Sequence, residues 1–435
     1  MTSLQMANRT PRLAGGAVCN LRCMLLSAAL ACSVGCGPAG PATRPASRAA
    51  DLIEHSSAAE DSNADDADIA NSQSSFDREA VLAQAADFAE RGELSDAALN
   101  LRKVLLVDPH DVGVLFDLAR VEAARGNLPV AVELLGEIPG DHPQAGLPAL
   151  GQSADWCFQL GRYDEAEAGY RKVLEFVPQA ALAHRQLAYL LNRQGRRHEA
   201  AQHVRELCNQ GDVRQDELHS LISLGDAMYD DPTQKVTAGE RPYFPIGASG
   251  EARRLVNQER YREAIAKLHD RVAADDVPPA VLALYGRAAA EAQDDERFRW
   301  WLTRIDDRTR EHADYWAAIA AVELRERRFE TATRALSEAI DRDPTDLISM
   351  SRIRQTLTTL GETDAAERWL DRWNAIHEMI DVNNRLVASA APDTEAIAEL
   401  ADRLTKLNRP LEALMWTTIQ GLHEGIPGSE MNQLY

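Results

Sequence analysis

Glycine recurs at an almost constant interval through the first half of the chain. Gly92, Gly126, Gly161 and Gly195 are separated by 34, 35 and 34 residues. An alanine stands five residues after each of them, and a proline follows in the first three units; these residues are Ala97, Ala131, Ala166, Ala200, Pro109, Pro143 and Pro178. Self-similarity at a period of roughly 20 to 50 residues is typical of stacked repeats. The chain is therefore expected to build a stack of similar units rather than one large core.

Each unit has the pattern of a helical hairpin. Glycine ends the first helix, because it adopts the left-handed backbone of the turn without steric cost. The small alanine lets the two helices of the hairpin approach closely. Proline stops the second helix, because it lacks the amide donor that would continue it. The pattern predicts an all-α protein.

The clearest unit is LGRYDEAEAGYRKVLEFVP within residues 147–180, and residues 78–111, 112–146 and 181–214 share its register. In this register the sequence resembles tetratricopeptide repeats over roughly residues 78–380, with irregular units inside the range. The resemblance implies a right-handed superhelical solenoid of antiparallel helix pairs. The first helices of such a solenoid line a concave face, which holds an extended peptide or a helix of a partner. Fold alone does not establish function, so this face is an expectation.

The register predicts two arrays. The first covers residues 78–229, and residues 230–247 have no helical period and are predicted as a loop, which is either functional or a spacer. A second array is predicted at 248–380, because Ala264 and Ala332 are 68 residues apart, which is two periods. In the degenerate unit between them, Gly286 takes the small position and Phe298 replaces the alanine. Residues 381–435 are expected to form a helical cap.

The N-terminal segment has the features of an export signal. Arginines precede a short apolar run at 24–34, and no Asp or Glu occurs before Asp51, so residues 1–35 are predicted as a signal peptide. The run ends in Ser33-Val34-Gly35-Cys36, which resembles the box of bacterial lipoproteins whose cysteine is lipidated, with Cys32 as the alternative. The expected location is the bacterial cell envelope, with a lipid anchor on the periplasmic side, or secretion without one. Residues 36–76 are predicted as a disordered tether.

The composition and the motifs argue against several functions. A net charge of -21, spread along the chain, disfavours nucleic acid, which needs clustered Lys and Arg, and favours basic or neutral partners. The sequence has no glycine-rich phosphate loop, paired-cysteine motif or GxSxG elbow, so no catalysis, cofactor or metal is expected. His198 and His203 are five residues apart, about 140° around a helix, which prevents them from binding one zinc ion from one face. Cys157 and Cys208 are expected to be buried, inert thiols.

The candidate binding residues are those that the repeat register places on the groove side of the first helices. They are Phe116, Arg120, Asp155, Phe158, Arg185, Tyr189, Asn192 and Arg193. Aromatic and arginine side chains are enriched at binding hot spots, and arginine binds a partner carboxylate in a bidentate manner. The Lys and Asn pattern of the family's carboxylate clamps is absent. The alternative is that these side chains are exposed without a ligand.

The expected function is a non-catalytic scaffold for protein–protein interaction, with a protein or peptide partner. One alternative is a regulatory subunit of an envelope enzyme or assembly complex. Another is a carbohydrate-binding or enzymatic protein that uses the aromatic residues of the second array, namely Phe298, Trp300, Trp301, Tyr315, Trp316, Trp369 and Trp373. Most of these are expected to pack in the core, whereas Trp300 is expected to be exposed.

Overall fold

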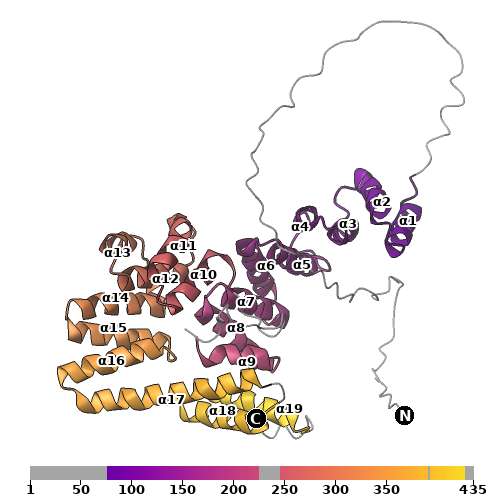
Figure 1. Ribbon diagram of the computed structural model, residues 1–435. Helices are drawn as coiled ribbons and strands as arrows, with labels where there is room; N and C mark the ends of the chain where they lie inside the picture. Colours follow the sequence, from indigo (N-terminus) through magenta and orange to yellow (C-terminus); the bar gives the residue numbers. More distant parts are fainter. Residues whose placement is uncertain (1–75, 225–244, 390–391, 427–435) are drawn as a thin grey trace, which may run out of the picture. The chain divides into compact units, whose positions relative to one another are not determined.

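The structure is a computed structural model that describes residues 76–224, 245–389 and 392–426, and every regular element among them is a helix (Figure 1). The all-α prediction is thereby confirmed. The predicted signal peptide with Cys32 and Cys36, the tether up to residue 75 and most of the 230–247 loop lie outside the described residues. None of the described helices is both long enough and apolar enough to cross a membrane.

The first eight helices form four consecutive antiparallel pairs, as the repeat register predicts. They are α1 (Arg78–Glu90), α2 (Leu94–Val107), α3 (Val112–Ala124), α4 (Leu128–Gly136), α5 (Gly146–Gln159), α6 (Tyr163–Phe176), α7 (Ala181–Arg193) and α8 (Arg197–Gln210). Helix α4 is short and ends three residues before Pro139, as expected from the proline.

The remaining helices begin with a short one and continue after residue 244. They are α9 (Gln215–Ile222), α10 (Gly247–Asn257), α11 (Tyr261–Ala273), α12 (Pro279–Glu291), α13 (Asp295–Leu302), the 3-10 helix η1 (Thr309–Glu311), α14 (Ala313–Arg325), α15 (Phe329–Arg342), α16 (Leu347–Leu360), α17 (Thr363–Ala388), α18 (Thr394–Lys406) and α19 (Pro410–His423). Helix α17 runs through residue 380, where the sequence predicted the end of the second array.

The turn inside each hairpin has one backbone geometry along the chain. Its left-handed residue is glycine in the first array, with φ between 74° and 85° at Gly92, Gly126, Gly161 and Gly195. In the second array the same place is taken by Glu259, Gln293, Arg327 and Gly361, each 34 residues after the one before. The next amide closes the turn onto a carbonyl five residues back, as in Arg162 N to Cys157 O at 2.9 Å and Asp294 N to Ala289 O at 3.0 Å. The backbone therefore keeps the period where the sequence loses its glycine.

The residue five positions after each turn lies between the helices of its pair. Ala97, Ala131, Ala166, Ala200, Ala264 and Ala332 are all fully buried, which confirms their predicted packing role. In the irregular unit, Phe298 takes this place and is 8% exposed. A Cβ on Gly286 would lie 2.2 Å from Cε2 of the buried Trp301, so the glycine leaves room for the indole ring.

The end of the first array and the C-terminal helices share one core. Helix α9 packs on α8, α17 and α19 (Figure 1). Leu221 belongs to the same buried cluster as Trp416. Nδ1 of His219 lies 2.7 Å from Oδ1 of Asn383, and Arg409 donates to the carbonyl of Leu221 at 2.6 Å. The expected C-terminal hairpin, α18 with α19, thus packs on the first array as well as on α17.

Candidate functional site

The predicted groove residues of α5 and α7 form an aromatic cluster with one arginine. The ring centroid of Phe158 lies 5.8 Å from that of Tyr189 and 5.7 Å from that of Tyr163. The guanidinium of Arg193 lies 5.1 Å from the Tyr189 centroid, and its Nη1 donates to the Tyr189 hydroxyl at 3.0 Å. Cation–π contact and hydrogen bonding together hold this arginine against the rings. The structure thus brings Phe158, Tyr189 and Arg193 together.

The chain covers part of this region itself. The amide of Ile246 donates to the carbonyl of Arg193 at 2.9 Å. A Cβ on Gly250 would lie 2.2 Å from that carbonyl oxygen, so the start of α10 packs directly on the C-terminal end of α7. Asn192, in the same turn of α7, is 3% exposed. Asn192 therefore does not face an open surface as the sequence predicted, because the first array alone did not indicate that α10 packs here.

Arg185 is held within the molecule. Its Nε lies 2.5 Å from Oε1 of Glu217, and its Nη2 lies 3.3 Å from Oδ1 of Asp212. Both acids belong to the segment around the start of α9, so the guanidinium joins α7 to α9. The predicted capture of a partner carboxylate at Arg185 would first require breaking these two ion pairs.

The groove-side residues of α3 and α5 remain more accessible. Arg120 is exposed, whereas Phe116 is half-buried against the core. Asp117 is exposed, yet surrounding protein raises the pKa of its carboxyl and Arg120 only partly opposes this effect. Burial also raises the pKa of Asp155, whose carboxylate accepts a hydrogen bond from the Tyr170 hydroxyl at 2.6 Å. The α3 and α5 part of the predicted groove therefore presents one exposed arginine, Arg120, together with the carboxyl groups of Asp117 and Asp155.

The aromatic residues of the second array are mostly structural, as expected. Trp301 is fully buried and its Nε1 donates to the carbonyl of Leu282 at 2.9 Å. Nε1 of Trp316 donates to the carbonyl of Arg310 at 2.8 Å. Phe298 and Tyr315 are buried, and Trp369 and Trp373 are half-buried against the core. Trp300 is 38% exposed, which confirms that it differs from the others.

The two histidines of α8 have different partners. His198 Nε2 lies 3.7 Å from Oδ2 of Asp343, whereas His203 Nδ1 lies 2.9 Å from Nδ1 of His184. The other ring nitrogen of His184 lies 2.9 Å from the carbonyl of Pro178, which can only accept. In the neutral pair, His184 therefore donates to this carbonyl and accepts from His203. Burial lowers the pKa of His203 to about 4.

The two cysteines in the described residues are free and buried, as predicted. Burial raises the pKa of the Cys157 thiol and raises that of Cys208 to about 12. Because the thiolate is the reactive form, both side chains are inert packing groups at neutral pH.

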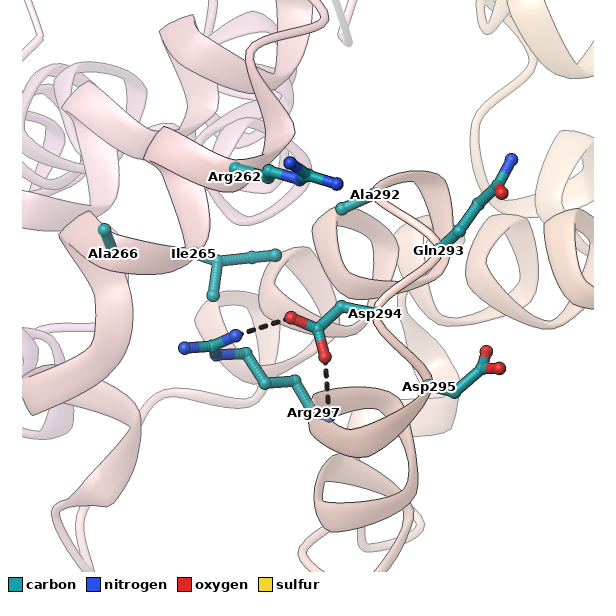
Figure 2. Close-up of a pocket in the computed structure, with 8 residues that line it drawn as sticks. All are labelled: Arg262, Ile265, Ala266, Ala292, Gln293, Asp294, Asp295 and Arg297. Carbon is teal, nitrogen blue, oxygen red and sulfur yellow. Dashed lines mark hydrogen bonds and ion pairs between the residues drawn. The ribbon is translucent and has the colours of Figure 1, made fainter.

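A hollow that the sequence did not indicate lies between α11 and the start of α13 (Figure 2). Its volume is about 510 Å³. Ala266 and Ala292 give it a small aliphatic wall, with Ile265, which is 3% exposed, behind them, and Arg262 and Gln293 stand at its edge. The one related feature of the sequence is that the turn at residue 293 lacks the usual glycine.

Comparison with known proteins agrees with the repeat register. Tetratricopeptide repeat family models match residues 88–150 and 158–214. No curated protein matches significantly.

Several solved structures are similar at low sequence identity. A tetratricopeptide repeat protein from Parabacteroides merdae is 14% identical, with 64% of this chain and 98% of that chain covered and a TM-score of 0.31. A structure of the APC/C hetero-tetramer Cut9–Hcn1 is 15% identical, with 80% and 72% covered and a TM-score of 0.27. The TPR2AB domain of yeast Sti1, in a complex with pHSP90, is 12% identical, with 78% and 98% covered and a TM-score of 0.26.

The family matches lie within the four helical pairs of α1 to α8, whose turns, buried alanines and spacing have been described above. They support a scaffold for protein interaction. The chain contains tetratricopeptide repeats at residues 88–150 and 158–214.

Proposed function

We propose that the protein is a non-catalytic scaffold that binds a protein or peptide partner on the groove side of α3 and α5. The observation that carries the proposal is the contrast between the two halves of the predicted site. Arg185, Asn192 and Arg193 on α7 are buried or engaged within the chain, whereas Arg120 on α3 is exposed. A partner would therefore meet Arg120 together with the half-buried ring of Phe116.

The test is crosslinking of the full chain to its partners, followed by mass spectrometry, for the wild type and Arg120→Glu. Arg120 is exposed, so its replacement is expected to change the free energy of unfolding by no more than about 0.5 kcal/mol. Arg334→Glu is the matched control, because Arg334 is an exposed arginine of α15 and the charge change is the same. Partners that disappear only with Arg120→Glu support the proposal.

The outcome that would refute this site is retention of the same partners by Arg120→Glu. If an enzyme is among the partners lost, the scaffold is a regulatory subunit of that enzyme, which is the alternative function.

We further propose that the protein is exported and held at the cell envelope by a lipid on Cys36. The support is the sequence of residues 24–36, where an apolar run ends at a small residue followed by cysteine. Radiolabelled palmitate should enter the wild type and not Cys36→Ser, whereas Cys32→Ser should retain the label. Labelling of Cys36→Ser, with loss in Cys32→Ser, would assign the lipid to Cys32 instead.

A further inference from the structure

Three of the four turns of the second array carry a side chain where the first array carries glycine. Glu259, Gln293 and Arg327 have φ values of 60°, 55° and 58°, a region that residues with a Cβ rarely adopt. All three side chains are exposed, so they add nothing to the core. Glycine would form the same turn with less strain, as it does at the four turns of the first array. Strained positions of this kind cluster at functional sites.

Two hollows lie at the turns of Glu259 and Gln293. The hollow of about 510 Å³ in Figure 2 adjoins Gln293, and a second one of about 280 Å³ is lined by Glu259 and its neighbours. Arg262 and Ala292 line both. The hollows and the unusual turn residues are independent observations that identify the same edge of the second array. A concave site with an aliphatic wall and a few polar groups is typical of binding sites.

Most of the charges around the hollows are already neutralised. Arg297 Nη1 lies 2.5 Å from Oδ2 of Asp294, and Asp295 is paired with Arg325 at 2.6 Å. Figure 2 shows the first of these pairs.

Arg262 differs from its neighbours. In the part of the chain that the structure describes, no hydrogen bond or ion pair joins its guanidinium to another residue, although Asp294 is within electrostatic reach. Its side chain extends along the edge of the hollow toward Ala292 (Figure 2). An open cation beside an aliphatic wall stands out on a chain with a net charge of -21.

We propose that this turn edge is a second interaction surface, which takes a partner segment that presents a carboxylate side chain next to an aliphatic one. The carboxylate would pair with Arg262, whose planar fork of donors matches it. The aliphatic side chain would fill the hollow beside Ile265. The exposed amide of Gln293 would bind the backbone of the segment. This surface is separate from the first-array site, so each can be tested while the other stays intact.

The test uses two fluorescein-labelled nonapeptides with the central sequence Leu-Glu-Leu or Leu-Gln-Leu in Gly-Ser flanks, titrated with the full chain by fluorescence polarisation. The Glu peptide is expected to bind about tenfold more tightly than the Gln peptide, because only a carboxylate forms a charge-assisted pair. Arg262→Gln should remove this preference. Arg299→Gln is the matched control, since Arg299 is an exposed arginine of α13 that does not line the hollow.

Gln293→Gly separates binding from folding. Glycine removes the strain, so the melting temperature should stay equal or rise, while the affinity for the Glu peptide falls. Equal affinity for the two peptides, an unchanged preference in Arg262→Gln, or the same loss in Arg299→Gln would each overturn the proposal. Arg120→Glu should leave peptide binding at this edge intact, so failure of the first-array site would not be mistaken for failure here.

Discussion

Replacing Gly286 by alanine tests whether the irregular unit is built around the indole of Trp301. Alanine in the middle of a helix is normally more stable than glycine by about 1 kcal/mol. Here, however, the new Cβ would lie 2.2 Å from Cε2 and 2.4 Å from Cζ2 of Trp301. The indole cannot easily withdraw, because it is fully buried and its Nε1 donates to the carbonyl of Leu282.

The expected magnitude follows from three opposing terms. Overpacking costs about 1 to 3 kcal/mol, and displacing the indole from its hydrogen bond costs about 1 kcal/mol more. The helix-propensity gain of about 1 kcal/mol offsets part of this cost. Gly286→Ala should therefore lower the free energy of unfolding by about 1 to 3 kcal/mol. Urea denaturation followed by circular dichroism measures it, and hydrogen exchange should locate the loss in α12 and α13.

A matched control and a rescue variant make the reasoning refutable. Gly151 lies in the middle of α5, and a Cβ there would meet no atom within 4 Å, so Gly151→Ala should raise stability by about 0.5 to 1 kcal/mol. Trp301→Ala should relieve the clash, so the double variant should be at least about 1 kcal/mol more stable than the sum of its single changes predicts. If Gly286→Ala is as stable as the wild type, the tight fit around Trp301 is not real.

Two further predictions concern buried ionisable groups. Asp314→Ala should lower the free energy of unfolding by about 3 to 5 kcal/mol in urea denaturation, because it removes the carboxylate that pairs with Arg253 and leaves Arg287 with only Asp346, 3.7 Å away. Asp307→Asn, in an exposed ion pair, should cost less than about 1 kcal/mol. The second prediction concerns His203, which is neutral in the folded protein because burial lowers its pKa to about 4. The unfolded state binds a proton at His203 near pH 6.5, whereas the folded state binds it only near pH 4. The free energy of unfolding is therefore unaffected by the titration of this side chain above about pH 6.5 and decreases as the pH falls from 6.5 to 4. His203→Gln should therefore reduce the loss of unfolding free energy between pH 7 and pH 4 by roughly 2 to 3 kcal/mol, and an unchanged loss would contradict the buried pairing with His184.

The electrostatic character of the first-array surface differs from the sequence expectation. Two of the three predicted arginines are engaged within the chain, Arg185 with acids around α9 and Arg193 with Tyr189. Carboxyl groups on α3 and α5 remain, and the surrounding protein raises the pKa of both the exposed Asp117 and the half-buried Asp155. A partner on this surface would therefore meet a mixture of charges rather than a row of arginines.

The sequence alone determined the class of the fold, the length of its unit and the packing between paired helices. The reason is that these features depend on contacts inside one unit or between neighbouring units. Such contacts recur about every 34 residues, so the residues that make them, such as the turn glycine Gly161 and the buried Ala166, recur in the sequence at the same interval. Even the degenerate unit could be located, because Gly286 and Phe298 kept its register. Buried Cys157 and exposed Trp300 followed from the same local reasoning.

Only the tertiary structure decided which of the candidate binding residues are exposed to solvent and available to a partner. Asn192 is buried and Arg185 is paired because α9 and α10 pack near α7. The turn at Gln293 keeps its left-handed geometry without glycine, because the closing hydrogen bond and the packing of α12 on α13 support it. The hydrogen bond between His219 and Asn383 joins residues 164 positions apart. Contacts at such a separation have no period, so a repeat pattern cannot predict them.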